Sequence, residues 1–254
     1  MSTTGRVLQC LKTRILLTHD SVCLLLPASG HPVSAKLIAH LSRRYPTQEH
    51  RPFFLEHRLF SDTSSQLPGS DVKQRSFTHV LNFSHDAQHA FVSSTRGGSP
   101  NELSTITIPV TSADSFASLI STKLQPAWYP RPTLNIEGGV CVAIEEKKLV
   151  VCVGDAKVSP RSQGAGTLRG TIVELFRREN ITSEGSDYTQ EETANDEAWI
   201  QGALEDLFEG ADVAFNARIL TSWTRPRASE DSTGMNTDPD WNLAKLYMAV
   251  FRPK

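Results

Sequence analysis

The chain has 254 residues, of which 39% are hydrophobic and 21% charged, and its formal net charge is −2. This length allows one large domain or two small ones, and the composition excludes an intrinsically disordered chain. The near-neutral charge gives no sign of a nucleic-acid or membrane surface as partner.

The N-terminal region is expected to hold neither a transmembrane helix nor a signal peptide. Lys12, Arg14, His19 and Asp20 interrupt its apolar residues. A membrane span needs about 20 predominantly apolar residues, and charges inside the apolar region argue against a signal peptide. We therefore expect neither membrane insertion nor secretion.

Hydrophobic periodicity in the first half predicts short strands around one helix. The helix follows Pro32, carries Val33, Leu37, Ile38 and Leu41, and ends near Arg44. The predicted strands are Cys23–Pro27, Arg51–Phe60, a hairpin of Phe77–Ser84 and His89–Thr95, and Leu103–Val110.

The segment Thr111–Arg178 predicts a helix followed by strands. The helix, Ser112–Gln125, would present Phe116, Leu119, Ile120 and Leu124 on one face, with Ser112 or Ser115 as its cap. The strands are Pro132–Glu137, the folded-back Val140–Ser159, and Thr167–Arg178. Apolar residues at successive positions predict that both faces are covered, one inside a sheet or barrel and the other by a helix.

The C-terminal part predicts two more helices, Asp196–Glu209 and 241–251, separated by a flexible linker at 221–240. The fold class is therefore α+β: an antiparallel β-barrel of about eight strands with flanking helices. We expect residues 1–21 to be an N-terminal extension outside the fold. The barrel domain would span 22–220 and include an acidic loop at 179–197.

Charge is distributed unevenly along this chain. Residues Glu179–Asn216 contain eleven acidic side chains and no Lys or Arg, so the remaining residues hold 26 basic against 17 acidic side chains. This segment is either a docking face that selects partners by charge or a solvated disordered loop.

The four cysteines, Cys10, Cys23, Cys141 and Cys152, form no CxxC pair and have no zinc-ligand spacing. Cys141 and Cys152 lie symmetrically about the predicted turn at residues 145–148, so they would face each other across a hairpin, close enough to interact. We expect two reduced, buried apolar side chains, and no oxidising compartment is required.

Three motifs imitate functional sites without meeting their requirements. His85 and His89 have the spacing of metal ligands on a helix, but they lie in a predicted turn and lack the adjacent Glu. Gly164–Gly170 is one residue too long for a dinucleotide loop, and a strand follows it. His19, Asp20 and Ser21 are merely adjacent. No catalytic, cofactor-binding or metal-binding residue is predicted.

Glu174 is a carboxylate in the middle of an apolar strand. Barrels that process triphosphates need several inward carboxylates, but only Glu137 and Glu145 accompany Glu174 on nearby strands, and no Glu-x-Glu pair occurs. A metal-dependent triphosphate-processing enzyme therefore remains only the alternative. A basic patch lacks the interleaved aromatic residues of a nucleic-acid site; its members would be Arg58, Arg75, Arg169, Arg177 and Arg178.

A family resemblance rests on the order of several segments. These are the start Met1–Gly5, the strand Phe54–Phe60, the loop Asp62–Gly69, and the strand-helix-strand block that ends in Leu168–Glu174. In this order they resemble the family of subunit 20 of the transcriptional Mediator complex, in a filamentous-fungal form. The resemblance covers most of Val22–Asn180 and, more loosely, the last two helices.

The resemblance implies a non-enzymatic nuclear coactivator subunit in the Mediator head module, built as a β-barrel with flanking helices. It implies contact with subunit eight and direct pairing with subunit eighteen, which has a related fold. Regulators would thereby be coupled to RNA polymerase II and the TATA-binding protein, without cofactors, direct nucleic-acid binding or membrane contact. A free-standing adaptor that docks through Glu184–Asp212 is a second alternative.

One segment departs from the family pattern. Arg6–Ser21 looks extra, as if Gly5 should join directly to the strand Val22–Pro27. Its charges interrupt the apolar strand, which indicates a retained intron or a mispredicted gene start. The alternative is a strand or helix specific to this lineage.

Overall fold

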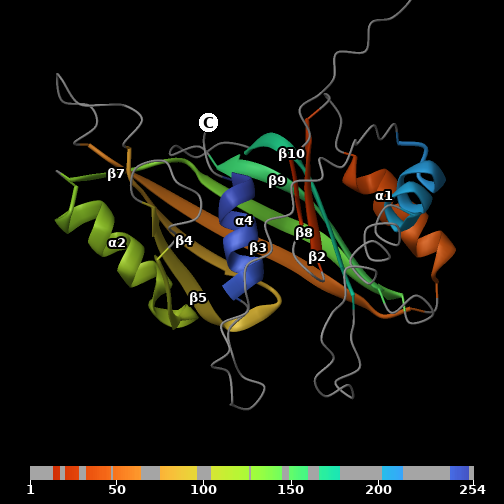
Figure 1. Ribbon diagram of the computed structural model, residues 1–254, viewed down its shortest axis with the longest axis horizontal. Coiled ribbons are helices and arrows are strands. Elements are labelled where there is room, and N and C mark those ends of the chain that lie inside the picture. The colour runs from red at the N-terminus through yellow and green to blue at the C-terminus, as the bar shows by residue number, and fades with distance from the viewer. Residues whose placement is uncertain are drawn as a thin grey trace, which may run out of the picture.

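The computed structural model describes the protein at residues 14–17, 21–28, 33–46, 48–63, 75–95, 104–125, 127–144, 149–159, 166–177, 202–213 and 241–251. Figure 1 shows a large, strongly twisted sheet with α1 beyond one side and α2 beyond the other. Among these residues, no helix has the length and hydrophobicity needed to cross a membrane.

The described residues form ten strands, the helices α1, α2 and α4, and a further helix at residues 202–210. The strands are β1 (Arg14–Leu17), β2 (Ser21–Pro27), β3 (His50–Asp62), β4 (Phe77–Phe83), β5 (Asp86–Thr95), β6 (Ser104–Pro109), β7 (Trp128–Pro130), β8 (Thr133–Ile144), β9 (Leu149–Ser159) and β10 (Thr167–Arg177). The helices are α1 (Ser34–Arg44), α2 (Ala113–Lys123), which follows a short 3₁₀ turn at Val110–Ser112, and α4 (Trp241–Phe251).

All ten strands belong to one antiparallel sheet. Its order is β1-β2-β10-β9-β8-β3-β4-β5-β6, and β7 pairs with β3 beside this path. The α+β class is therefore confirmed, but the closed barrel of about eight strands is not, because β1 and β6 are the two ends of the order and do not pair.

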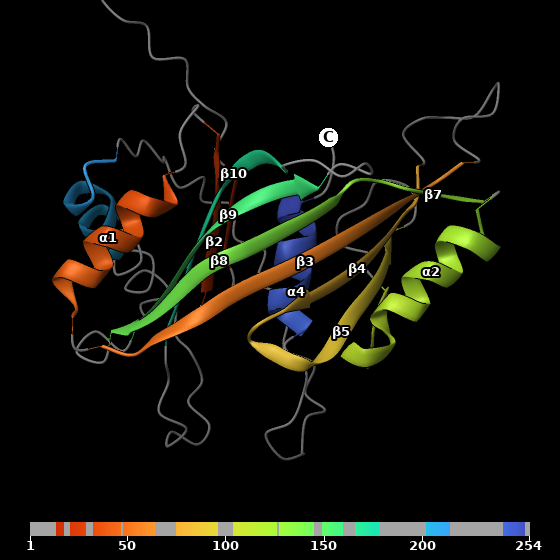
Figure 2. The same cartoon turned by 180° about the vertical axis from the view of Figure 1, so that it is seen from behind.

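Helix α4 explains how an open sheet encloses a core. It contacts β1 and β2 near one end of the strand order and also β4 toward the other. In Figure 1 it lies in front of the sheet, and in Figure 2 the same helix lies behind it. An apolar helix therefore covers the surface that strand closure would cover in a barrel.

Both faces of the central strands are buried, as their apolar sequences predict. Cys152 and Ile172 pack on the α4 face with Tyr247. Val151 and Val173 pack on the opposite face, against Leu37 of α1. The described part of the helix predicted at Asp196–Glu209, which begins at residue 202, also contributes to the second face, because Leu204, Leu207 and Phe208 are buried there.

Strand β8 replaces two of the predicted strands. Thr133–Glu137 and Val140–Ile144 lie in one twelve-residue strand, whose pairing with β9 shifts between Ile136 and Val140. Gly138 lies at this shift with a φ of 69°, a conformation that favours glycine. Two glycines thus mark a bulge in a continuous strand rather than a break between strands.

Helix α2 buries only part of the face that was predicted for it, since Ile120 is buried and Phe116 half-buried as expected but the two leucines are not. Ala113, Ala117 and Ile120 are buried, whereas Leu119 and Leu124 are about half exposed. The predicted side-chain cap is also absent, since Ser112 makes no capping hydrogen bond. Small residues allow the helix to lie close to the sheet, and the larger side chains remain at the surface.

The N-terminal extension is described only in part. Residues Arg14–Leu17 form β1 and pair with β2 from Leu17↔Val22 to Arg14↔Leu25. Residues 1–13, the acidic loop at 179–197 and the linker at 221–240 lie outside the described residues. The expectations for these three segments therefore stay predictions.

Candidate functional site

A row of polar and sulfur-containing side chains crosses four neighbouring strands on the face that α4 covers. Glu174 of β10 pairs in register with Cys23 of β2 on one side and with Cys152 of β9 on the other. Cys152 in turn pairs with Cys141 of β8. Residues directly opposite one another point to the same face, so strand register alone places all four side chains in one line.

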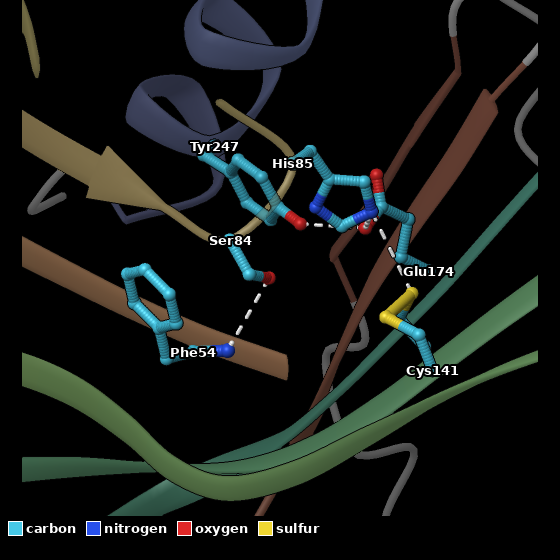
Figure 3. Close-up of a disulfide and its surroundings, with 7 residues drawn as sticks. Phe54, Ser84, His85, Cys141, Glu174 and Tyr247 are labelled. Atoms are coloured by element: carbon cyan, nitrogen blue, oxygen red, sulfur yellow. Dashed lines mark hydrogen bonds and ion pairs between the residues drawn. A yellow bond between two sulfur atoms is a disulfide. The ribbon is translucent and has the colours of Figure 1, made fainter. Parts of the chain in front are cut away.

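Glu174 is fully buried near the middle of this row and contacts groups from outside the sheet. Tyr247 of α4 donates a hydrogen bond to Oε2 of Glu174 over 2.6 Å. The same oxygen lies 3.6 Å from Nε2 of His85. Figure 3 shows the phenol and the imidazole both directed at this carboxyl group. A buried carboxyl group needs such partners, because burial without them costs several kcal/mol.

Cys141 and Cys152 are joined by a disulfide bond. The prediction that they face each other across the hairpin is confirmed, whereas the expectation of two separate reduced thiols is wrong. Cys23 remains a buried free thiol, whose pKa is raised by burial and then by the nearby charge of Glu174. The row therefore contains one disulfide bond and one free thiol.

His85 is held above the sulfur atoms by the turn between β4 and β5. The amide of Phe54 donates to Oγ of the adjacent Ser84 over 3.4 Å, and the amide of Ser84 donates to the Phe54 carbonyl over 3.0 Å. The imidazole lies edge-on to the rings of Phe53 and Phe176. Its Nε2 atom is 3.6 Å from Sγ of Cys152.

The environment of His85 favours its neutral form. Burial lowers the pKa of this imidazole to about 4, and its side chain is 18% exposed. The exposed part faces a cavity of about 280 Å³ that is also lined by Cys141, Glu49 and Arg51. This cavity leads from the surface to Cys141 of the disulfide. An ion pair between Glu49 and Arg51, with a separation of 2.9 Å, lies at its edge.

Two further histidines, His57 and His79, form a pair under α4. Nε2 of His57 is 2.9 Å from Nδ1 of His79, and the His57 ring stacks on Phe251 at a centroid distance of 5.4 Å. Burial, followed by the proximity of His79, lowers the pKa of His57 well below its usual value. Both imidazoles belong to the packed interior, so this pair is structural.

The residues singled out from the sequence do not converge on one site. His85 and His89 point to different partners, since Nδ1 of His89 lies 3.0 Å from a carboxylate oxygen of Asp86. Glu137 is exposed on β8, so it does not join Glu174. Gly170 allows the Leu26 carbonyl to approach closely. Glu145, Gly164, His19 and Asp20 lie outside the described residues.

The predicted basic residues are likewise dispersed. Arg58 forms ion pairs with Glu56 and with Asp114, which ties β3 to α2. Arg169 is exposed on β10, which is separated from β3 by two strands. The described part of the chain therefore brings no basic patch together from these residues, and Arg178 lies outside it.

Most of the exposed large apolar side chains belong to elements at one end of the sheet. Of five exposed large hydrophobic residues among those described, four lie between residues 106 and 129: Ile106 of β6, Leu119 and Leu124 of α2 or its end, and Tyr129 of β7. Helix α2 packs beside β7, and the preceding 3₁₀ turn packs against β5. This end, which lies around α2 in Figure 2, is called the α2 end below.

The sequence contained only part of the signal for these sites. The symmetry of Cys141 and Cys152 about their turn revealed one pair of the row. The alignment of Cys152 with Glu174 depends on the register between β9 and β10, which changes between Leu168 and Gly170. The approach of His85 depends on a turn folding back over a strand distant in sequence, and no local pattern encodes it.

Of the comparisons with known proteins, the one with family models identifies a family. Residues 20–252 match the family described as the TATA-binding related factor (TRF) of subunit 20 of the Mediator complex. No curated protein matches the chain. The structure of the PH1819 protein from Pyrococcus horikoshii OT3 is similar at 11% identity and a TM-score of 0.39, over 74% of this chain and 89% of that one. A TM-score this low supports no further comparison.

The family match covers nearly the whole described fold, from β2 to α4. It excludes the alternative of a triphosphate-processing enzyme, and it excludes a free-standing adaptor, because this family consists of subunits of a larger assembly. The chain belongs to the Mediator subunit 20 family, whose members are non-enzymatic nuclear proteins that act in RNA polymerase II transcription.

Proposed function

We propose that this Mediator subunit is a scaffold of the head module and pairs directly with subunit eighteen through its α2 end. Contact with subunit eight would follow from the same placement. Through this module the subunit would help couple regulators to RNA polymerase II and the TATA-binding protein. The observation that carries the proposal is the concentration of exposed apolar side chains at the α2 end.

The exposed residues of the α2 end are large. Ile106 is 54% exposed and Leu119 is 49% exposed. Apolar surface in contact with water costs roughly 25 cal/mol per Å², so covering a group of such side chains favours association. Single exposed hydrophobic residues are ordinary, whereas a large exposed apolar patch marks an interaction site.

The edge of the sheet provides a second reason to place the interface here. Among the described strands, β6 pairs with β5 alone, and its side chains are exposed or half-buried throughout. An unprotected edge presents backbone donors and acceptors to a strand of another chain. A partner with a related sheet could therefore pair with β6 while it covers Ile106 and Leu119.

The proposal is tested by co-expression of the full chain with subunit eighteen, followed by size-exclusion chromatography. Wild type should elute as a 1:1 pair. Leu119→Glu should weaken the pair at least tenfold, because a carboxylate would be buried against apolar surface. Phe54→Glu is the matched control, since Phe54 is 43% exposed on β3 but lies outside the α2 end.

Separate elution of the wild-type chains would refute direct pairing. A pair that survives Leu119→Glu but is lost in Phe54→Glu would place the interface elsewhere. Neutralising Glu191, Glu192, Asp196 and Glu197 together tests the acidic segment as the docking face. We expect these four substitutions to leave the pair intact.

A further inference from the structure

We propose that the dithiol form of this protein binds one borderline-soft divalent cation of the zinc type, through Cys141, Cys152 and His85, with Glu174 as the fourth ligand. This metal site goes beyond the scaffold role, and none was expected from the sequence. The described residues bring the three ligand atoms, two sulfurs and one imidazole nitrogen, within 4.8 Å of one another.

The setting of the protein makes the dithiol form relevant. Subunits of Mediator work in the nucleus, where low-molecular-weight thiols keep most cysteines reduced. Two molecules of such a thiol reduce the Cys141–Cys152 disulfide to two thiols and become a disulfide themselves. A divalent cation then replaces the two thiol protons, which pass to solvent, and two metal–thiolate bonds form.

The spacing of His85 and Cys152 suits tetrahedral coordination. With Zn–S bonds of about 2.3 Å and Zn–N bonds of about 2.0 Å, tetrahedral geometry places sulfur and nitrogen about 3.5 Å apart. Nε2 of His85 lies 3.6 Å from Sγ of Cys152. It also lies 3.6 Å from Oε2 of Glu174. Glu174 does not lie within 4.8 Å of both sulfur atoms, so its side chain has to move toward the ion on binding. Once the disulfide is reduced, the two sulfur atoms can separate to the spacing that the metal requires.

The surroundings provide both access and orientation. Cys141 and His85 line the cavity of about 280 Å³, so an ion can reach them from the surface. Tyr247 donates its hydroxyl to the proposed carboxylate ligand, Glu174. Hydrogen bonds of this kind orient metal ligands, and their loss typically lowers metal affinity about 10–100-fold. Figure 3 shows these groups around the sulfur atoms.

The experiment uses the full chain, reduced with a phosphine in the absence of oxygen and freed of metal by a chelator. Titration with Co²⁺ should produce the visible bands of tetrahedral thiolate coordination at one ion per chain. Titration with Zn²⁺ should abolish these bands and raise the melting temperature. The oxidised chain, with its disulfide intact, should show neither the bands nor the rise in melting temperature.

Matched variants separate this site from adventitious binding. His85→Gln and Glu174→Gln should each lower the affinity for Zn²⁺ at least about tenfold relative to the wild type. The affinities are measured by competition with a chelator. His89→Gln is the control for the first, because His89 contacts Asp86 instead. Cys23→Ser and Cys10→Ser should retain binding, which excludes the other two thiols as ligands.

Two results would overturn the proposal. One is a reduced wild-type chain that binds no Co²⁺ or Zn²⁺ in a 1:1 ratio. The other is a spectrum that survives Cys141→Ser or His85→Gln unchanged. If a variant unfolds, the wild-type chain still tests the proposal, because its reduced form should bind the metal and its oxidised form should not. A pair that resists reduction also contradicts the proposal.

Discussion

Oε2 of Glu174 in β10 accepts a hydrogen bond of 2.6 Å from the hydroxyl of Tyr247 in α4, and both side chains are fully buried. The two residues are 73 positions apart in sequence. This contact joins the C-terminal helix to the middle of the sheet. It also explains how an isolated carboxyl group is tolerated among apolar strands.

Removing the Tyr247 hydroxyl tests the importance of this contact. Tyr247→Phe should lower the free energy of unfolding by about 1–3 kcal/mol, because a buried acceptor loses its donor. Tyr129→Phe is the control, since that ring is 42% exposed, and it should change stability by less than about 0.5 kcal/mol. Urea denaturation followed by circular dichroism measures both, and equal effects would contradict the assignment.

The packing of α4 can be tested independently of the hydrogen bond. Leu243 is 4% exposed in the cluster around Phe83 and Ile172, whereas Lys245 of the same helix is exposed. Leu243→Ala should destabilise the fold by about 2–5 kcal/mol through lost apolar contacts and a cavity. Lys245→Ala should have little effect. A small loss in Leu243→Ala would show that α4 is not part of the core.

Gly170 tests the close approach of β10 and β2. A Cβ atom at this position would lie 2.2 Å from the Leu26 carbonyl oxygen, and neither backbone can move freely within the sheet. Gly170→Ala should therefore cost about 1–3 kcal/mol. At Gly202 nothing lies within 4 Å, so Gly202→Ala should be neutral or stabilise the helix by up to about 1 kcal/mol. Thermal denaturation distinguishes them, and the opposite order would contradict the register.

The buried histidines predict that stability falls in mild acid. The folded state holds His57 with a pKa well below its usual value and His85 with a pKa of about 4. As pH falls below about 6.5, the unfolded chain binds these protons first, so the free energy of unfolding decreases. Each proton contributes at most about 1.4 kcal/mol per pH unit.

The variant His57→Gln isolates one of these two groups. It should reduce the dependence of stability on pH between about pH 6.5 and 4, while the contribution of His85 remains. Urea midpoints of the variant and of the wild type at several pH values, each referred to the same protein at pH 8, measure this difference. A pH dependence identical to that of wild type would show that His57 is not buried in its neutral form.

Local patterns were sufficient for most elements of the fold. The range 241–251 coincides with α4, and the hairpin of β4 and β5 was predicted nearly to its ends. These elements have strong periodicity and clear turns. The open sheet was not predictable, because an apolar strand has the same sequence pattern whether its neighbour is a strand or a helix.

The predictions that were wrong failed for the same reason: they depended on tertiary contacts. Leu119 and Leu124 were assigned to the buried face of α2, but Ala113 and Ala117 occupy that face because the helix lies close to the sheet. His85 was interpreted as an ordinary turn residue, since its approach to Cys152 depends on the hydrogen bonds between Ser84 and Phe54. Periodicity reports which residues are apolar, but not which surface another element covers.

The central claim, a scaffold that pairs through its α2 end, is tested most directly by hydrogen–deuterium exchange on the chain with and without subunit eighteen. The account predicts that binding slows the exchange of amides in β6 and α2, with little change in α1. Protection confined to α1 and residues 202–210, with β6 and α2 unchanged, would contradict it.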